Sequence, residues 1–248
     1  MSLEANIQKA KEIVSNARRI SAFTGAGISV DSGIPDFRSE GGLWKRFDPL
    51  EHATLESFMR NPTKFWTMGK ELAETILKAN PNAAHISLAR LEEQGKLNGV
   101  ITLNIDNLHQ SAGNKKVIEL HGNYLKAHCI ECKSEFFGKK VHESVAQGEI
   151  PPKCEKCGGI LKSEAILFGE PLPEEPMAEA VELCRTTDLM IVIGTSLTVY
   201  PAAYLPQLAK NAGAKIILIN IEGSNKDEVA DIVLRGRARD ILPAIADY

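Results

Sequence analysis

Three short apolar runs constrain the fold of this chain more than any other feature. The runs "GVITL" (99–103), "LMIVIG" (189–194) and "KIILIN" (215–220) are continuously apolar, which is typical of parallel strands buried on both faces. Helical patterns lie around them, including "NAAHISLARLEEQG", which begins at a capping Asn82, "EEPMAEAVELCRTT", and "PAAYLPQLAKNAG", which ends at Gly213. Strands that alternate with helices predict an α/β fold with a Rossmann-like, doubly wound parallel sheet.

The beginning of the chain predicts an amphipathic helix with one apolar face, and it lacks the apolar core of a signal peptide. That face consists of Ile7, Ala10, Val14 and Ala17. No apolar stretch approaches the roughly 20 residues that a membrane span needs. The net charge of −3 gives no general reason to bind nucleic acid or an anionic membrane. We therefore expect a cytoplasmic protein with reduced thiols and without direct membrane or nucleic-acid binding.

Two segments interrupt the alternation of strands and helices. Residues 40–79 are helical in pattern and rich in aromatic side chains, whereas residues 122–163 carry four cysteines and little apolar bulk. We predict that the helical segment and the cysteine segment pack together as a smaller second domain. That domain is inserted in a large domain made of residues 1–39, 80–121 and 164–248.

Four cysteines have the spacing of a zinc site. Two C-x-x-C pairs, separated by 21 residues, can each aim two thiolates at one ion and together complete a tetrahedron. The pairs are Cys129 with Cys132 and Cys154 with Cys157. Four thiolates leave no position for a reactive water, so we predict one structural Zn²⁺ that orders this insertion. Disulfides or redox dithiols are the alternatives. We expect no ligand role for His128, and core packing for the fifth cysteine, Cys184.

The stretch "FTGAGISVDSGIPDFR" (23–38) begins like a phosphate-binding loop. An apolar run leads into Gly25-Ala26-Gly27, but Val30 occupies the place of the third glycine in G-x-G-x-x-G. The glycines alone are weak evidence, because they also suit an ordinary strand-to-helix turn. The stretch then runs on to Asp36-Phe37-Arg38, where a plain dinucleotide-binding fold would continue its helix.

Polar or small residues follow four of the predicted strands. Because ligands collect at the carboxyl ends of parallel strands, these residues are candidates for one binding site. They are Asn104, Asp106 and His109, then His121-Gly122-Asn123, then Gly194-Thr195-Ser196, and finally Asn220 with Glu222. Each has a structural alternative, such as a helix cap for Asn104 or a backbone-bonded core position for His121. We expect His85 to be a core residue and His52 and His142 to lie on the surface.

Together these motifs resemble the sirtuin family. "GAGIS…SGIPDFR", "NIDNLH", "ELHGN", the two C-x-x-C pairs, "FGEPLP", "GTSLTVYPAA" and "IN" occur in the order of that family, from about Ile20 to the C-terminal helix. Sirtuins are NAD-dependent protein-lysine deacylases with a Rossmann-like large domain and a small zinc-bearing domain. The resemblance therefore implies the same activity here, with NAD and one structural Zn²⁺.

The resemblance also implies how NAD is held. The glycine loop lets the backbone approach the pyrophosphate. Its extension folds over the cofactor, with Phe37 over the departing nicotinamide, Arg38 near the phosphates and Asp36 ordering the loop. The implied cofactor-binding residues are Gly25, Ala26, Gly27, Asp36, Phe37, Arg38, Asn104, Ile105, Asp106, Gly194, Thr195, Ser196, Asn220, Glu222 and Ala238. The last of these belongs to "GRA" (236–238), whose backbone would contact adenine.

In the implied reaction, the acyl oxygen of a modified lysine attacks the anomeric carbon of the nicotinamide ribose. His121 is the general base on a ribose hydroxyl, with Asn104 and Asp106 as further catalytic residues. The products are nicotinamide, free lysine and O-acyl-ADP-ribose. The peptide substrate adds as a strand between residues 168–170 and 196–200, by β-augmentation. The implied substrate-binding residues are Phe168, Gly169, Glu170, Leu197 and Val199.

One departure from the sirtuin pattern affects the expected activity. Leu103 stands where sirtuins usually carry a glutamine that is expected to bond a ribose hydroxyl. This opens two alternatives, a protein ADP-ribosyltransferase and a weakly active NAD-binding protein. A dehydrogenase is disfavoured, because the sequence contains no recognisable hydride-acceptor site.

Other departures concern the substrate. Lys162-Ser163 replace the common Arg-Pro, and Ala165 replaces a common valine, so we expect these residues to flank the peptide channel and widen it. Sirtuins that prefer acidic acyl groups carry Tyr and Arg at positions that match Gly69 and Leu72. We therefore predict a neutral acyl group.

Overall fold

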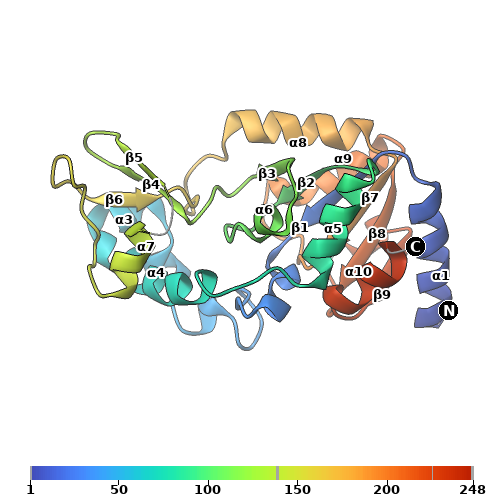
Figure 1. Cartoon of the computed structure of the whole chain (residues 1–248), viewed down its shortest axis with the longest axis horizontal. Helices are drawn as coiled ribbons and strands as arrows, with labels where there is room; N and C mark the ends of the chain where they lie inside the picture. Colours follow the sequence, from blue (N-terminus) through green and yellow to red (C-terminus); the bar gives the residue numbers. More distant parts are fainter. Residues whose placement is uncertain (1, 138–139, 225, 247–248) are drawn as a thin grey trace.

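A six-stranded parallel sheet forms the larger part of the molecule, on the right in Figure 1. The computed structural model describes residues 2–137, 140–224 and 226–246. The strands are β1 (Ile20–Thr24), β2 (Leu97–Thr102), β3 (Val117–Glu119), β7 (Leu189–Ile193), β8 (Lys215–Asn220) and β9 (Ile232–Arg235). Their order, β3-β2-β1-β7-β8-β9, reverses between β1 and β7. This arrangement confirms the predicted doubly wound, Rossmann-like sheet.

Helices cover both faces of this sheet. One face carries α1 (Leu3–Asn16), α5 (Ala83–Glu93) and α10 (Ala238–Ala246), and the other carries α8 (Glu174–Thr186) and α9 (Leu205–Asn211). Successive strand residues enter different cores, so that Ala22 packs with the first set and Phe23 with the second. All five residues of β7 are buried, which explains why that run is continuously apolar. We call this part the sheet region.

The predicted amphipathic helix is confirmed as α1. Its side chains Ala10 and Val14 are buried, and Ile7 and Ala17 are partly buried against the same cluster. Ser2 caps the helix with its side chain. Among the residues that the structure describes, no helix is long and apolar enough to cross a membrane.

The other predicted helices are present with small differences. Asn82 caps α5 by accepting a hydrogen bond from Ala84 N (2.9 Å), and the helix ends just before Gly95, whose φ is +73°. The helix expected from residue 201 is instead a 3-10 turn, Ala202–Tyr204, followed by α9. Strand β9 was not predicted, because its four residues alternate in burial and form no continuous apolar run.

A second, smaller group of elements lies at the opposite end of Figure 1, and we call it the small region. It contains a three-stranded antiparallel sheet in the order β5-β4-β6. Its elements are α2 (Pro49–His52), α3 (Leu55–Arg60), α4 (Pro62–Ile76), α7 (Lys140–Ala146), β4 (Lys126–Cys129), β5 (Glu135–Phe137) and β6 (Leu161–Ser163). Phe58, Trp66 and Tyr124 share one buried cluster with Cys129 and Cys154. The helical and cysteine segments thus pack on one core, while the exact domain boundaries stay a prediction.

Three further expectations concern single side chains. His85 and Cys184 are fully buried, as predicted. His142 is also fully buried, so its predicted surface position is wrong. Its ring lies 4.3 Å from the ring of Tyr124 and 5.9 Å from that of Trp66, and burial lowers its pKa to about 4. Helix α7 has seven residues, and the apolar ones among them are too few to predict from the sequence that His142 is buried.

Candidate functional site

A cavity of about 790 Å³ lies at the carboxyl ends of the parallel strands and continues to the small region. Its volume is within the range of about 300 to 1,000 Å³ that is typical of ligand sites. All cofactor and substrate residues predicted from the sequence line it except Asp106. These are Gly25, Ala26, Gly27, Asp36, Phe37, Arg38, Asn104, Ile105, Gly194, Thr195, Ser196, Asn220, Glu222 and Ala238, with Phe168, Gly169, Glu170, Leu197 and Val199. His121 also lines the cavity.

The glycines at the start of the loop are required by close packing of two strand ends. Gly27 N donates to Gly194 O (2.8 Å), and Gly25 N donates to Ile193 O (3.0 Å). A Cβ on Gly25 or Gly27 would lie within 2.8 Å of Gly194 backbone atoms. The loop after β1 therefore lies directly against the loop after β7, at the point where the strand order reverses. In doubly wound sheets this switch point is where ligands bind.

The extended part of the loop is tied down by Asp36. Its Oδ1 accepts hydrogen bonds from Arg38 N (3.0 Å) and Ser39 N (2.9 Å). This turn places Phe37 beside Trp44, with 5.1 Å between ring centroids, and Trp44 in turn lies 6.2 Å from Phe168. Aromatic rings from three segments thus form one wall of the cavity.

Asn104 and Asp106 meet at a serine that the sequence interpretation missed. Ser29 Oγ donates to Asp106 Oδ2 (2.6 Å) and accepts from Asn104 Nδ2 (3.1 Å), and all three residues are buried. Asp106 also accepts from Leu108 N (2.9 Å), and burial raises its pKa. Asp106 therefore lies one layer behind the cavity and orients Asn104 through Ser29. A small hydroxyl residue two positions after Gly27 was the only available signal in the sequence.

His121 follows β3 and has one ring nitrogen engaged. Its Nδ1 donates to Leu103 O (3.1 Å), since a carbonyl can only accept. In the neutral ring Nε2 is then the unprotonated atom, free to act as a base. Burial lowers the pKa of His121, and the nearby Arg38 charge lowers it further. His121 therefore meets both expectations from the sequence: its ring is bonded to backbone, and it lines the cavity.

The strand ends after β7 and β8 are linked to each other. Asn220 Nδ2 donates to Thr195 O (3.1 Å), and Thr195 Oγ1 accepts from Leu197 N (3.2 Å). Leu197 has a positive φ of +54°. Thr195 therefore closes a tight turn rather than capping a helix, which leaves the turn open toward the cavity.

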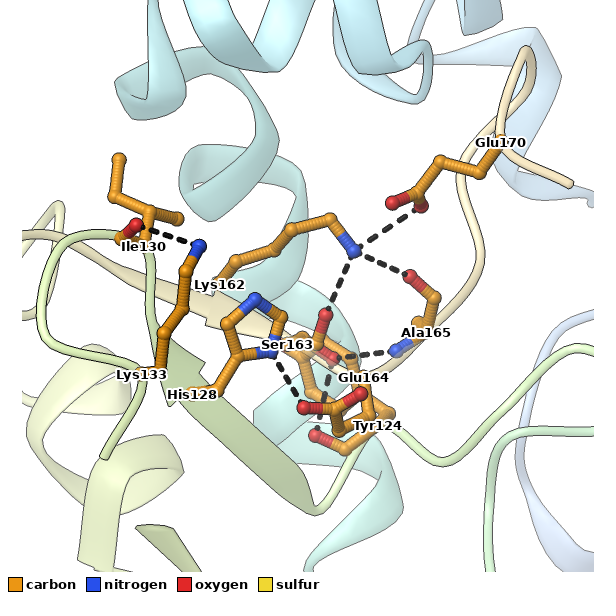
Figure 2. Close-up of polar contacts among 9 residues, drawn as sticks. All are labelled: Tyr124, His128, Ile130, Lys133, Lys162, Ser163, Glu164, Ala165 and Glu170. Atoms are coloured by element: carbon orange, nitrogen blue, oxygen red, sulfur yellow. Dashed lines mark hydrogen bonds and ion pairs between the residues drawn. The ribbon is translucent and has the colours of Figure 1, made fainter. Parts of the chain in front are cut away.

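The opposite wall is residues 165–170, which pair with the small region. Phe168 N donates to Ala53 O (2.8 Å), and Leu55 N donates to Phe168 O (2.9 Å). Ala165 lines the cavity, whereas Lys162 and Ser163 are buried next to it without lining it, and their effect on the width of the peptide channel stays a prediction. Figure 2 shows the side chain of Lys162 directed toward Ala165 and Glu170.

The part of the cavity lining that belongs to the core of the small region is uncharged. It includes Ala53, Phe65, Met68, Leu72, Tyr124 and Ala165. Gly69 lies outside this lining, because Tyr124 Oη donates to Gly69 O (2.6 Å) and a Cβ at Gly69 would lie 2.6 Å from that hydroxyl. No lysine or arginine of the small region is among the described residues that line the cavity.

The four cysteines converge as a metal site. Their Sγ atoms all lie within 4.8 Å of one another, with 3.5 Å between Cys129 and Cys157 and 3.6 Å between Cys132 and Cys154. Zinc–sulfur bonds of about 2.3 Å in a tetrahedron place sulfur atoms about 3.8 Å apart, so the cluster fits Zn²⁺. The cysteines are unpaired as disulfides. His128 bonds Glu164 instead (Nδ1 to Oε1, 2.5 Å), which agrees with its predicted absence from the ligand set.

The chain matches known proteins over nearly all of its length. The model of the Sir2 family matches residues 25–201. The "NAD-dependent protein deacylase 2" of Archaeoglobus fulgidus is 45% identical over 246 residues, which cover 99% of this chain and 96% of the relative. A protein of the same name from Pyrobaculum aerophilum is 45% identical over 236 residues, covering 95% and 93%.

Solved structures agree with these relatives. One described as a structural basis for the mechanism and regulation of Sir2 enzymes has a TM-score of 0.92 and 44% identity, and the match covers 98% of this chain and 97% of that one. Another, Sir2Af2 bound to a myristoylated histone peptide, has a TM-score of 0.85 and 40% identity, covering 98% and 96%.

Proposed function

This chain belongs to the Sir2 family, and we propose that the residues around its cavity perform the activity of that family in the roles given below. The chain is an NAD-dependent protein deacylase. It uses NAD as cosubstrate and carries one structural Zn²⁺ at its four cysteines. NAD supplies the bond between nicotinamide and ribose, and the acyl group of a modified lysine passes to ADP-ribose when that bond is broken.

Polar and small residues on the rim of the sheet region would hold NAD. We assign the pyrophosphate to the Gly25–Gly27 backbone, which the packing against Gly194 leaves exposed to the cavity on one side. Asn220 and Thr195, bonded to each other, would bind the phosphate and adenosine side together with Ser196 and Glu222. The backbone near Ala238 would contact adenine.

Nicotinamide would occupy the pocket behind the aromatic wall. Phe37 would cover it, held there by the turn that Asp36 organises, and Arg38 would lie toward the phosphates. Asn104 would contact the ribose and nicotinamide directly, and the Ile105 backbone would lie beside the carboxamide. Asp106 would act as a positioning residue, because it reaches Asn104 only through Ser29.

His121 would be the general base on a ribose hydroxyl. Its Nδ1–H is held by Leu103 O, so the lone pair of Nε2 is the one available at the cavity. Burial keeps the ring neutral at lower pH than an exposed histidine, which is the form a base needs. The single observation that carries this assignment is this hydrogen bond at the wall of the cavity.

Peptides with acylated lysines are the substrates. A related structure is a Sir2 complex with p53 peptide and NAD⁺, and the Sir2Af2 structure holds a histone peptide. We propose that the peptide adds as a strand between residues 168–170 and 196–200, so that its backbone rather than its sequence is read. The uncharged lining that the small region contributes to the cavity favours a neutral acyl group.

The deciding experiment is product analysis with NAD and an acetylated peptide. We expect nicotinamide, deacetylated peptide and O-acetyl-ADP-ribose in equal amounts, with little nicotinamide released when the peptide is omitted. Failure to release nicotinamide at saturating NAD and peptide would contradict the assignment.

One observation favours a second candidate, transfer of ADP-ribose to protein. Leu103 lines the cavity where a ribose-bonding amide is expected, and an apolar side chain there holds the sugar less firmly. Mass spectrometry of the acceptor protein separates the two reactions, because ADP-ribosylation adds mass to the protein whereas deacylation removes it.

A further inference from the structure

A buried lysine lies directly behind the wall formed by residues 165–170. Lys162 is 6% exposed and is the central residue of β6. Figure 2 shows its Nζ donating to Ser163 O (3.1 Å), Ala165 O (3.3 Å) and Glu170 Oε2 (3.1 Å). An ammonium group has three protons, and these three oxygens satisfy all of them.

Glu170, the carboxylate partner of Lys162, also forms hydrogen bonds within the segment 165–170. Glu170 Oε2 also accepts from Leu167 N (2.7 Å), and Glu170 N donates to Leu167 O (3.0 Å). The side chains of Lys162 and Glu170 are 7% and 18% exposed, so the pair is largely removed from water. A buried pair persists only when both charges are well bonded, and here each is. Residues 163–170 are therefore folded around one ammonium–carboxylate contact.

The outer face of this segment is the proposed peptide wall. Residues 165 to 170 all line the cavity, whereas Lys162 does not. The segment also touches the catalytic side, because Ile166 N donates to His121 O (2.9 Å). That contact joins two backbone groups and does not involve the lysine. Loss of the lysine would thus affect the wall more than the position of His121.

The inner side of the segment continues into the sheet that carries the metal site. In the pairing of β4 with β6, His128 lies opposite Lys162 and Cys129 lies opposite Leu161. The lysine is therefore the point at which the metal-ordered strands meet the substrate wall.

We propose that Lys162 is a positioning residue for the peptide substrate: its contact with Glu170 holds residues 165–170 in the shape that accepts the peptide strand. This inference rests on the proposed function. Lys162 touches neither peptide nor NAD and acts only through the wall. It should therefore set the affinity for peptide, while NAD binding and the rate of the bound complex depend on other residues.

The test compares Lys162→Met with wild type at saturating NAD. We expect the KM for acetylated peptide to rise about tenfold, with kcat and the Kd of NAD changed less than about twofold, because only peptide binding is weakened. Lys162→Arg should restore the KM, since a guanidinium also offers several donors to a carboxylate. The matched control is Lys126→Met, which removes a half-exposed lysine from neighbouring β4 and should leave the peptide KM unchanged.

A double-mutant cycle separates this role from direct contact of Glu170 with peptide. If the two residues act as one pair, Lys162→Met combined with Glu170→Gln should raise the peptide KM no further than the larger single change. Should Lys162→Met fail to fold, Lys162→Gln takes its place in the cycle, because an amide can still donate to the two carbonyl oxygens but cannot pair its charge with Glu170. An unchanged peptide KM, with or without a loss of kcat, would overturn the proposal, and so would additive effects in the cycle. Inactive wild-type protein would instead contradict the proposed function.

Discussion

The sheet region and the small region become ordered by different physical means. The sheet region buries its four central strands, each of five or six residues, among aliphatic side chains on both faces, so we expect its core to form without a metal. The small region has strands of three or four residues, and two of its four cysteines are exposed. It gains order from an ion that the chain must bind. The cofactor rim belongs to the first region, whereas the substrate wall is attached to the second, so the two functions should be separable.

Removal of Zn²⁺ should have the largest effect, and only the small region should lose its order. The chain has two tryptophans: Trp66 is fully buried in the core of the small region, whereas Trp44 lies beside Phe37 in the wall of the cavity, so exposure of Trp66 is the signal that reports on the small region. Metal-free protein, or Cys154→Ser, should show tryptophans exposed to water and no peptide-dependent turnover. Structural zinc contributes about 10 kcal/mol or more to folding in small zinc modules, which is enough to abolish order there.

NAD binding supplies the control for that experiment. Because Gly25, Gly194 and Asn220 belong to the sheet region, the Kd of NAD in metal-free protein should change only a few-fold, and far-UV circular dichroism should keep most of its helical signal. Equal loss of NAD binding and tryptophan burial would mean that the two regions fold as one unit.

His121→Ala should have the next largest effect, at the junction of the two regions. Loss of a general base costs about 10²- to 10⁴-fold in rate, so turnover of acetylated peptide should fall by that amount. The free energy of unfolding and the Kd of NAD should stay close to wild type, because the ring makes one hydrogen bond to Leu103 O. Turnover that survives the substitution would remove His121 from its assigned role.

The same contrast explains what the sequence could predict. Strands β7 and β8 were predicted from their apolar runs, because a strand that is buried on both faces needs apolar side chains at successive positions. The cysteines were recognised because metal geometry fixes their spacing. Strands β4, β5 and β6 have no such run, since short strands beside a metal site need little apolar surface.

Contacts between distant segments were the other part that the sequence did not predict. Ser29 joins Asn104 to Asp106 across more than 70 residues of chain, and no local pattern marks that contact. Lys162 was expected beside the peptide channel, but no local pattern indicates that its partner is Glu170. Local patterns indicate which strand end a residue follows, whereas its partners depend on how the loops pack.

His142→Phe should change the acid stability of the small region. Burial lowers the pKa of His142 to about 4, and neither ring nitrogen has a partner among the described residues. The unfolded chain binds a proton below its ordinary pKa of about 6.5, so wild type loses stability as the pH falls from about 6.5 to about 4. Phenylalanine removes this loss.

The expected size of that change is testable by denaturant titration at two pH values. The gain in free energy of unfolding of His142→Phe over wild type should be about 2 kcal/mol larger at pH 5 than at pH 7. Tryptophan fluorescence is the readout, because His142 packs against Trp66. An equal difference at both pH values would show that His142 does not contribute to acid sensitivity.

Leu103→Gln should have the smallest effect, and it alters the sheet region alone. The backbone of residue 103 keeps its bond to His121, so only the side chain that faces the cavity changes. A new amide that bonds a ribose hydroxyl contributes about 1 kcal/mol, or about fivefold in kcat/KM for NAD. Leu103→Met, which keeps the volume without the amide, is the control and should match wild type. The peptide KM should not move, because the peptide wall belongs to the other side of the cavity. A folded Leu103→Gln variant with unchanged or lower turnover would mean that leucine suits the ribose of this enzyme, and that the departure from the family pattern reflects a different placement of the sugar.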